Sequence, residues 1–199
     1  MTIFYRLGQK LYINITNKCP CACTFCIRNY TNTVGDAHSL WLDKEPTIDE
    51  IKSNFLSRKD INQIDEIVFC GYGEPMERAE DVIDICTFIK SEYPSKPVRI
   101  NTNGLVRLIN SDFIVSKLAI ADSVSISLNA DDANEYVRLV NPRFGAKAFD
   151  ELLNFAIAAK EHTNVVLTVV DSCLSEERVE NCRQLANKLG LPLRLRSTM

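Results

Sequence analysis

Short apolar runs alternate with segments of helical periodicity along almost the whole chain, and this alternation strongly restricts the fold. Six runs have the composition of strands; they are residues 11–15, 66–70, 98–101, 123–128, 165–170 and 193–195. Helical spacing is found between them, over residues 48–56, 79–91, 111–118, 149–162 and 175–189. Strands joined by helices form right-handed βαβ units and a parallel sheet. Because a closed barrel needs eight such units, six predict an α/β fold with a curved parallel sheet, an open partial (β/α)6 barrel.

Length and composition exclude several classes of protein. The 199 residues suit one domain, spanning residues 1–199. The net charge of −3 makes a nucleic-acid partner unlikely, since nucleic-acid-binding domains are normally basic. No apolar run reaches the roughly 18 residues of a membrane-spanning helix, and residues 1–6 do not resemble a signal peptide, so no membrane partner is expected. We therefore expect a cytoplasmic protein with reduced cysteines.

Four of the eight cysteines are crowded into residues 19–26. Cys19, Cys23 and Cys26 have the spacing C-x3-C-x2-C, which provides three thiolates, whereas a cube of four irons needs four ligands. One iron would then be open to another ligand. Structural zinc usually takes two separated pairs of ligands, and this run is too crowded for that pattern or for disulfides. Cys21 could compete for the fourth iron or could be structural.

The crowded cysteines follow the first predicted strand, so they lie at the end of a strand where open α/β folds place their chemistry. Three further polar motifs follow the next strands in order. They are Gly-Tyr-Gly-Glu-Pro at 71–75, Asn-Thr-Asn-Gly at 101–104 and Ser-Ile-Ser-Leu-Asn at 125–129. Because the carboxyl ends of parallel strands meet at one edge of the sheet, we expect the four motifs to converge there.

With these motifs in this order, the chain resembles the radical S-adenosylmethionine (SAM) enzymes over about residues 11–195. It is most similar to the group called TatD-linked radical SAM proteins, through residues 19–29, 71–75, 136–139 and 168–171. The resemblance implies a [4Fe-4S] cluster bound by Cys19, Cys23 and Cys26, with SAM on the open iron. It implies reductive cleavage of SAM to methionine and a 5′-deoxyadenosyl radical, which abstracts a hydrogen atom from a substrate.

The resemblance also implies residues that contact SAM. Residues 71–75 would contact its methionine amino group, with Gly71 and Gly73 allowing close approach of the backbone and Glu74 supporting the contact. Phe25 would pack near the adenine.

Further SAM contacts are expected from the third and fourth strands. Asn101 and Ser127 would form hydrogen bonds with the ribose or the carboxylate, and Asn129 is a weaker candidate at the same edge. Alternatively, Asn101 and Ser127 only satisfy backbone groups at the strand ends. No residue is assigned a catalytic role, and Cys173 after the fifth strand could be a reactive thiol or an ordinary loop cysteine.

Such an enzyme needs an electron donor, such as flavodoxin or ferredoxin, and a substrate that the sequence does not identify. The open side of the barrel leaves room for a large substrate such as a protein segment. Some arginines could bind an anionic substrate or the SAM carboxylate, or could be solvated at the surface; these are Arg138, Arg143, Arg194 and Arg196.

Two other functions compete with this one. A non-catalytic iron–sulfur protein for electron transfer or sensing would explain the cysteines but not the three other motifs. A SAM-dependent methyltransferase that uses no radicals would not need the cysteines.

Overall fold

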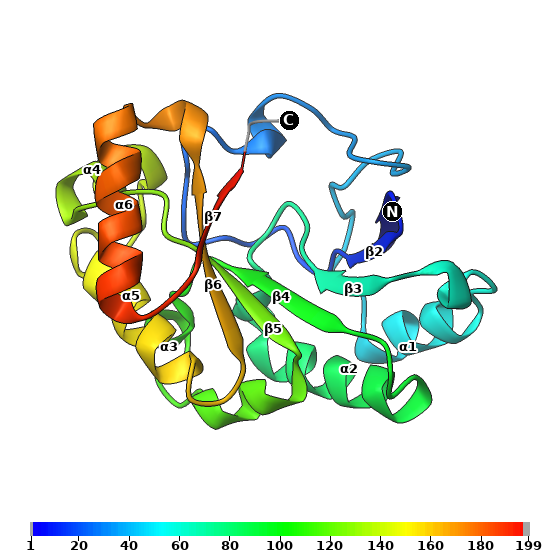
Figure 1. The fold of residues 1–199 in the computed structure, drawn as a ribbon. Helices are drawn as coiled ribbons and strands as arrows, with labels where there is room; N and C mark the ends of the chain where they lie inside the picture. The colour runs from blue at the N-terminus through cyan, green and yellow to red at the C-terminus, as the bar shows by residue number, and fades with distance from the viewer. Residues whose placement is uncertain (1, 197–199) are drawn as a thin grey trace.

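A seven-stranded, curved and unclosed sheet organises the molecule, and the computed structural model describes residues 2–196 of it. The strands lie in the order in which they occur along the chain: β1 (Phe4–Leu7), β2 (Lys10–Ile13), β3 (Glu66–Phe69), β4 (Val98–Thr102), β5 (Ser123–Ser127), β6 (Asn164–Val170) and β7 (Leu193–Arg196). Strands β2 to β7 are parallel, and β1 pairs antiparallel with β2. Within residues 2–196, β7 does not pair with β1, so the barrel is open (Figure 1). The predicted fold class is confirmed, with β1 as an additional strand.

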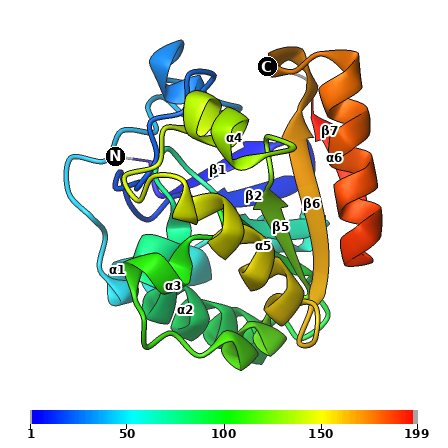
Figure 2. The same cartoon turned by 90° about the vertical axis from the view of Figure 1, so that its left-hand side faces the viewer.

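Helices cover the outer face of the sheet, as Figures 1 and 2 show. The α-helices are α1 (Ile48–Leu56), α2 (Ala79–Glu92), α3 (Val106–Ile109), α4 (Ala133–Val140), α5 (Lys147–Ala159) and α6 (Glu176–Leu189). Short 3-10 turns are η1 (Ile27–Asn29), η2 (Ile61–Gln63), η3 (Pro75–Arg78), η4 (Val115–Ile120) and η5 (Asp171–Cys173). No helix within residues 2–196 has the length and apolar character needed to cross a membrane.

The two faces of the sheet differ in chemistry because successive side chains of a strand point to opposite sides. One set of strand residues packs against the helices and forms the main core; Phe69 and Ile100, for example, join Val82 and Ile85 of α2. The other set faces the concave side and is largely polar. Its polar members include Lys10, Glu66, Arg99, Asn101, Ser125, Ser127, Thr168, Arg194 and Arg196.

One predicted helix differs in the structure. The helix predicted over 111–118 is not formed: α3 ends before it, at Ile109, a turn follows, and only residues 115–118 of the segment are helical, as part of η4. In that turn the Asn110 side chain accepts a hydrogen bond from the Asp112 backbone at 3.1 Å. Short polar side chains compete in this way with helical hydrogen bonds, which explains the interruption.

Candidate functional site

The crowded cysteines lie on the loop that follows β2, as predicted. Cys19, Cys23 and Cys26 are half-buried, whereas Cys21 is buried. A hydrogen bond from the Cys21 thiol lowers the pKa of Cys19 to about 7, and the positive charge of Arg28 acts in the same direction. Burial raises the pKa of Cys23 to about 12, and the neighbouring Cys19 and Cys26 add to the effect.

The thiols therefore influence one another, but they do not yet form a metal-binding group. Across residues 2–196, no three His, Cys, Asp or Glu side chains are arranged to hold a metal ion. Cys19, Cys23 and Cys26 are thus not grouped as metal ligands in the described residues. Their assignment as cluster ligands stays a prediction.

The segment that carries the four crowded cysteines, residues 19–26, is called the cysteine loop below. It is fixed on one side by the end of α4, which Figure 2 shows beside the blue N-terminal segment. The Thr24 backbone N–H donates to the Leu139 carbonyl at 2.9 Å, and the Arg143 N–H donates to the Pro20 carbonyl at 2.8 Å. These bonds run between segments more than a hundred residues apart in sequence. They define the path of the backbone that carries the cysteines.

Cys21 is directed into this contact and away from solvent. It forms an isolated backbone bridge with Pro142, and its side chain is only 5% exposed. The Asn103 side-chain amide donates to the Cys21 sulfur at 3.7 Å. These contacts favour a structural role for Cys21, in contrast to its three half-buried neighbours.

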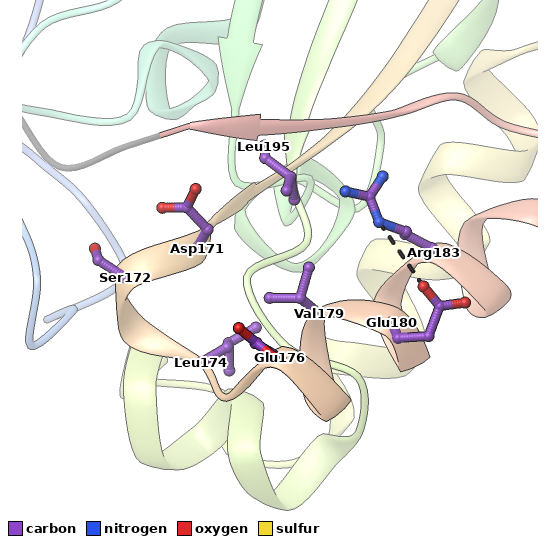
Figure 3. Close-up of a pocket in the computed structure, with 8 residues that line it drawn as sticks. All are labelled: Asp171, Ser172, Leu174, Glu176, Val179, Glu180, Arg183 and Leu195. Atoms are coloured by element: carbon purple, nitrogen blue, oxygen red, sulfur yellow. Dashed lines mark ion pairs between the residues drawn. The ribbon is translucent and has the colours of Figure 1, made fainter.

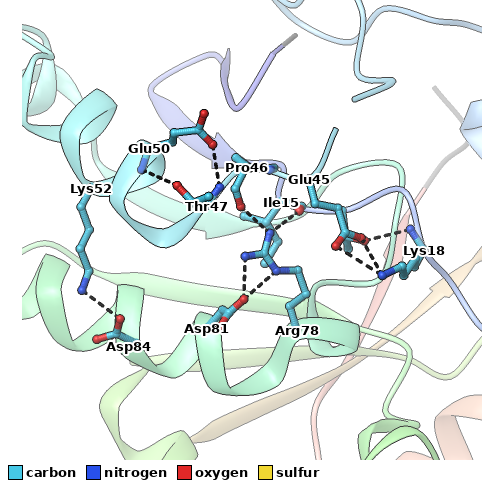
Figure 4. Close-up of polar contacts among 11 residues, drawn as sticks. Ile15, Lys18, Glu45, Pro46, Thr47, Glu50, Lys52, Arg78, Asp81 and Asp84 are labelled. Atoms are coloured by element: carbon cyan, nitrogen blue, oxygen red, sulfur yellow. Dashed lines mark hydrogen bonds and ion pairs between the residues drawn. The ribbon is translucent and has the colours of Figure 1, made fainter. Parts of the chain in front are cut away.

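Arg78 fixes the start of the same loop from the other side, as Figure 4 shows. Its guanidinium donates to the carbonyls of Ile15 at 2.9 Å and Pro46 at 2.8 Å. It also forms an ion pair with Asp81 at 2.6 Å. One side chain thus joins the exit of β2, the segment before α1, and the first turn of α2.

We expect the substitution Arg78→Met to lower the free energy of unfolding by about 1–3 kcal/mol, because two carbonyls lose a charged donor. Lys52→Met is a matched control in the same region, since it removes an ion pair with Asp84 on the surface and a cation–π contact 5.5 Å from the Phe88 ring centroid, but no bond to a backbone carbonyl. Such pairs contribute about 0–1 kcal/mol. Urea unfolding of both variants checks this, and equal losses would contradict the role given to Arg78.

Gly71 and Gly73 bring the loop after β3 against the cysteine loop. A Cβ atom on Gly73 would lie 2.3 Å from the Thr16 carbonyl oxygen and 2.6 Å from that of Lys18. A Cβ on Gly71 would lie 2.0 Å from the Asn14 side-chain oxygen. Close approach was expected toward a ligand, but the structure shows that the missing side chains make room for the neighbouring loop. A contact of this segment with SAM stays a prediction.

Glu74 connects the ends of two strands. It is buried, and its carboxylate accepts hydrogen bonds from the backbone N–H groups of Met76 at 3.0 Å and Asn103 at 2.7 Å. Burial raises its pKa to about 8, and the charge of Cys19 adds to this, while the N–H donors oppose it. Both oxygens already have partners, so Glu74 orders the edge of the sheet whether or not it also supports a ligand.

Asn101 and Ser127 lie on the concave face, on the neighbouring strands β4 and β5. Both have an arginine as partner: the Asn101 oxygen accepts from Arg99 at 2.6 Å, and the Ser127 hydroxyl accepts from Arg196 at 3.5 Å. The structure therefore brings the two predicted residues to one face. Their pairing with Arg99 and Arg196 was not predicted from the sequence.

The two remaining predicted residues differ in position. Asn129 is buried, has a left-handed backbone with φ of 56°, and accepts a hydrogen bond from the Val170 N–H at 3.4 Å. It therefore joins the ends of β5 and β6. Phe25 is half-buried on the cysteine loop and packs against the main core.

Tyr136 belongs to the stretch 136–139 that supports the family resemblance, but the sequence analysis assigned it no role in this site. It is fully buried on α4, and its hydroxyl has no hydrogen-bond partner among the residues that the structure describes, 2–196. Burial raises its pKa, and the nearby charges of Cys21 and Cys23 contribute. A buried hydroxyl without a partner costs free energy, and a sulfur cluster on these cysteines would supply an acceptor. The surroundings therefore fit such a cluster. The signal in the sequence was the spacing of Tyr136 and Leu139, which share one helix face.

A pocket of about 350 Å³ lies elsewhere, between η5, the first half of α6 and the outward side of β7 (Figure 3). None of the predicted site residues lines it. The lining residues are Asp171, Ser172, Leu174, Glu176, Val179, Glu180, Arg183 and Leu195. Leu195 points to the opposite side of β7 from Arg194 and Arg196, so this pocket is separate from the concave face.

Comparison with known proteins identifies relatives of the whole described fold. GTP 3′,8-cyclase from Corynebacterium glutamicum is 28% identical over 197 residues, which cover 96% of this chain and 49% of that protein. A probable dual-specificity RNA methyltransferase RlmN from Clostridium acetobutylicum is 23% identical over 192 residues, covering 94% of this chain and 51% of that protein. This chain therefore spans about half the length of these relatives.

Solved structures show the same fold. Streptococcus suis SuiB bound to its precursor peptide SuiA matches with a TM-score of 0.71 and 17% identity, over 97% of this chain and 40% of SuiB. Archaeal TYW1 matches with a TM-score of 0.61 and 12% identity, over 96% of this chain and 67% of that one. At these identities the likeness concerns the fold alone.

The family model described as "Radical SAM superfamily" matches residues 13–186. That range includes the cysteine loop and the three polar motifs at the strand ends. It confirms the predicted superfamily and its cofactors, while the narrower resemblance to the TatD-linked group stays a prediction. The chain belongs to the radical SAM superfamily, a family of enzymes that use a [4Fe-4S] cluster and S-adenosylmethionine.

Proposed function

We propose that this chain binds a [4Fe-4S] cluster through Cys19, Cys23 and Cys26 and uses it to cleave SAM reductively. The cluster would supply the electron that breaks the sulfonium bond, and the resulting 5′-deoxyadenosyl radical would abstract a hydrogen atom from a substrate. The observation that carries the proposal is the family match over residues 13–186, which includes all three half-buried cysteines. We take residues 1–199 as a single radical SAM core domain.

The chain's own residues would position the reactants. Contacts of the loop with α4 and Arg78 fix the backbone of the three cysteines. Asn101 and Ser127 provide hydrogen-bonding groups on the concave face for SAM, and Asn129 lies at the adjoining strand ends. Residues 71–75 lie against the cysteine loop and would reach the methionine part of SAM, while Phe25 would pack near adenine.

The substrate is not fixed by family membership, because the relatives are named for different ones. They include a GTP cyclase, a probable RNA methyltransferase and a protein solved with its precursor peptide. A protein segment remains a candidate here. The chain would also need an electron donor such as flavodoxin or ferredoxin, and we place the reaction in the cytoplasm.

Titration of the reconstituted protein with SAM tests this function against an electron-transfer or sensing role. Binding of the SAM amino and carboxylate groups to the open iron should change the electron paramagnetic resonance spectrum of the reduced cluster. An electron-transfer protein with no site for SAM would give an unchanged spectrum at saturating SAM. That result would reject the proposal in favour of the alternative.

We expect Ser127→Ala and Asn101→Ala each to weaken SAM binding by about 2- to 13-fold, because each removes one hydrogen bond worth roughly 0.5–1.5 kcal/mol. Ser123→Ala is a suitable control, since Ser123 lies on the same strand and face as Ser127 but at its opposite end. Calorimetric titration of the cluster-loaded variants measures the effect. If Ser123→Ala weakens binding as much as Ser127→Ala, the assignment is wrong.

We expect Tyr136→Phe to keep its iron but to shift the reduction potential of the cluster to a more negative value. A hydrogen bond to a cluster sulfur stabilises the reduced form, so its loss should shift the potential by roughly 20–65 mV. The measurement is a redox titration followed by electron paramagnetic resonance. Tyr30→Phe is the control, because Tyr30 is exposed and its hydroxyl donates to the Thr24 carbonyl. Equal potentials in wild type and Tyr136→Phe would show that Tyr136 makes no such bond.

A further inference from the structure

Arg196 carries a buried polar atom without a partner on the concave face. The Nε atom of its guanidinium is shielded from solvent and forms no hydrogen bond. Among residues 2–196, the one hydrogen bond of its side chain is a long one, from Nη2 to the Ser127 hydroxyl at 3.5 Å. Among residues 2–196, no carboxylate lies within the 4.0 Å of an ion pair with Arg196 or its neighbour Arg194.

The charges on this face do not balance. Glu66 pairs with both Arg99 at 3.0 Å and Lys10 at 2.7 Å, and it is the one carboxylate that strands β2 to β7 direct to the concave side. Within the described part of the chain, the side chain of Arg194 has only the Ser125 hydroxyl as a hydrogen-bond partner, at 3.0 Å. The carboxylate of Glu66 is therefore the one anion on this face for four cations, which are Lys10, Arg99, Arg194 and Arg196. Among residues 2–196, Arg194 and Arg196 on the edge strand β7 are the two of these that pair with no carboxylate.

This arrangement is unfavourable for Arg196 in the absence of a ligand. Desolvation lowers its pKa, the charge of Cys70 opposes this, and the charges of Arg194 and Arg99 act in the same direction as desolvation. Removing a cation from water costs free energy unless an anion and hydrogen bonds compensate it. A guanidinium with a free edge is suited to bind two oxygens of a carboxylate or phosphate together.

We propose that Arg196 and Arg194 bind an anionic group, a phosphate or carboxylate, of the substrate. The inference rests on the proposed function, because it places the substrate beside Ser127, a predicted SAM contact. The carboxylate of SAM has the same chemistry and is the other source. The substrate is favoured because Arg194 contacts Ser125, which lies two residues before Ser127 on β5 and so farther from the carboxyl ends of the strands. The cationic group therefore extends into the concave face and away from the cysteine loop.

Inorganic pyrophosphate is the probe, and calorimetric titration of the cluster-loaded, oxidised protein is the measurement. Wild type should bind pyrophosphate, and Arg196→Met should bind it at least 10-fold more weakly, as expected for the loss of a charged hydrogen bond. Arg183→Met removes the same charge from the outer side of α6, where Arg183 lies 3.9 Å from Glu180, and should bind within 2-fold of wild type. Equal affinities in wild type and Arg196→Met, or no binding by wild type, would overturn the inference.

A second arm separates the two sources of the anion. Saturating SAM should leave the affinity for pyrophosphate within 2-fold, whereas competitive displacement by SAM would assign the site to the SAM carboxylate and overturn the inference. Arg196→Lys keeps the charge and loses the planar fork, and it should bind at least 3-fold more weakly than wild type. If Arg196→Met does not fold, the test rests on Arg196→Lys. An affinity of Arg196→Lys for pyrophosphate equal to that of wild type would then reject the site. Pyrophosphate binding is measured without a reductant, so the result of this titration does not depend on whether the protein cleaves SAM.

Discussion

Replacing any one of Cys19, Cys23 and Cys26 by alanine should abolish assembly of the iron–sulfur cluster, whereas Cys21→Ala should retain its iron. Three thiolates leave no spare ligand for the cube, so each loss should be complete. Cys21 is expected to differ because its sulfur is buried and contacts the Asn103 amide. Iron and sulfide content after anaerobic reconstitution measures the result.

Cys86→Ala provides a control for the general loss of a buried thiol. Cys86 lies fully buried on α2, away from the cysteine loop, and should retain full iron content. Full iron content in Cys23→Ala, or loss in Cys21→Ala alone, would show that the ligands are assigned to the wrong cysteines.

The second large effect is expected at Gly73. A Cβ at this position would meet two backbone carbonyl oxygens at 2.3 and 2.6 Å, and backbone atoms cannot rotate away as a flexible side chain can. Gly73→Ala should therefore lower the free energy of unfolding by about 3 kcal/mol, the upper part of the range for overpacking, and displace the cysteine loop. We expect it to lose the cluster as well.

Gly145→Ala is the matched control for Gly73→Ala. Nothing lies within 4 Å of a Cβ on Gly145, and its cost comes only from a positive φ of 65°. That strain should lower the free energy of unfolding by about 1–2 kcal/mol, and Gly145→Ala should retain its full cluster content. Denaturant unfolding and iron analysis of both variants give the comparison. Normal stability and full iron content in Gly73→Ala would contradict the packing described for the two loops.

Much of the fold could be predicted because periodicity and capping are local properties. The helix at 48–56 was predicted from its spacing and from Thr47 and Glu50, and both hydrogen bonds of that capping box are present. The strand β1 was missed because it has only four residues and because the two-residue turn Gly8-Gln9, which joins it to β2 in a hairpin, was not recognised. The ring of Tyr5 stacks on the ring of Tyr12 in β2, with the ring centroids 5.0 Å apart. This contact between strands cannot be predicted from the periodicity of the sequence.

The candidate site was predicted in position more than in detail. Parallel strands place their carboxyl ends together, so the convergence of the cysteine loop with the segments around Glu74 and Asn101 followed from their order. The packing of Gly73 against the cysteine loop was not predicted, because what a missing Cβ faces depends on the neighbouring loop, and its contact with SAM stays a prediction. The unpaired hydroxyl of Tyr136 and the unpaired guanidinium of Arg196 depend on burial and charge balance, which only the packed structure defines.

The measurement that tests the central claim most directly is mass spectrometry of 5′-deoxyadenosine after anaerobic incubation of the reduced, cluster-loaded protein with SAM. Wild type should form 5′-deoxyadenosine and methionine, slowly without substrate, and Cys23→Ala should form none above background. The account would be contradicted if the wild-type cluster stayed reduced beside bound SAM and gave no 5′-deoxyadenosine, even with cell extract present to supply a substrate.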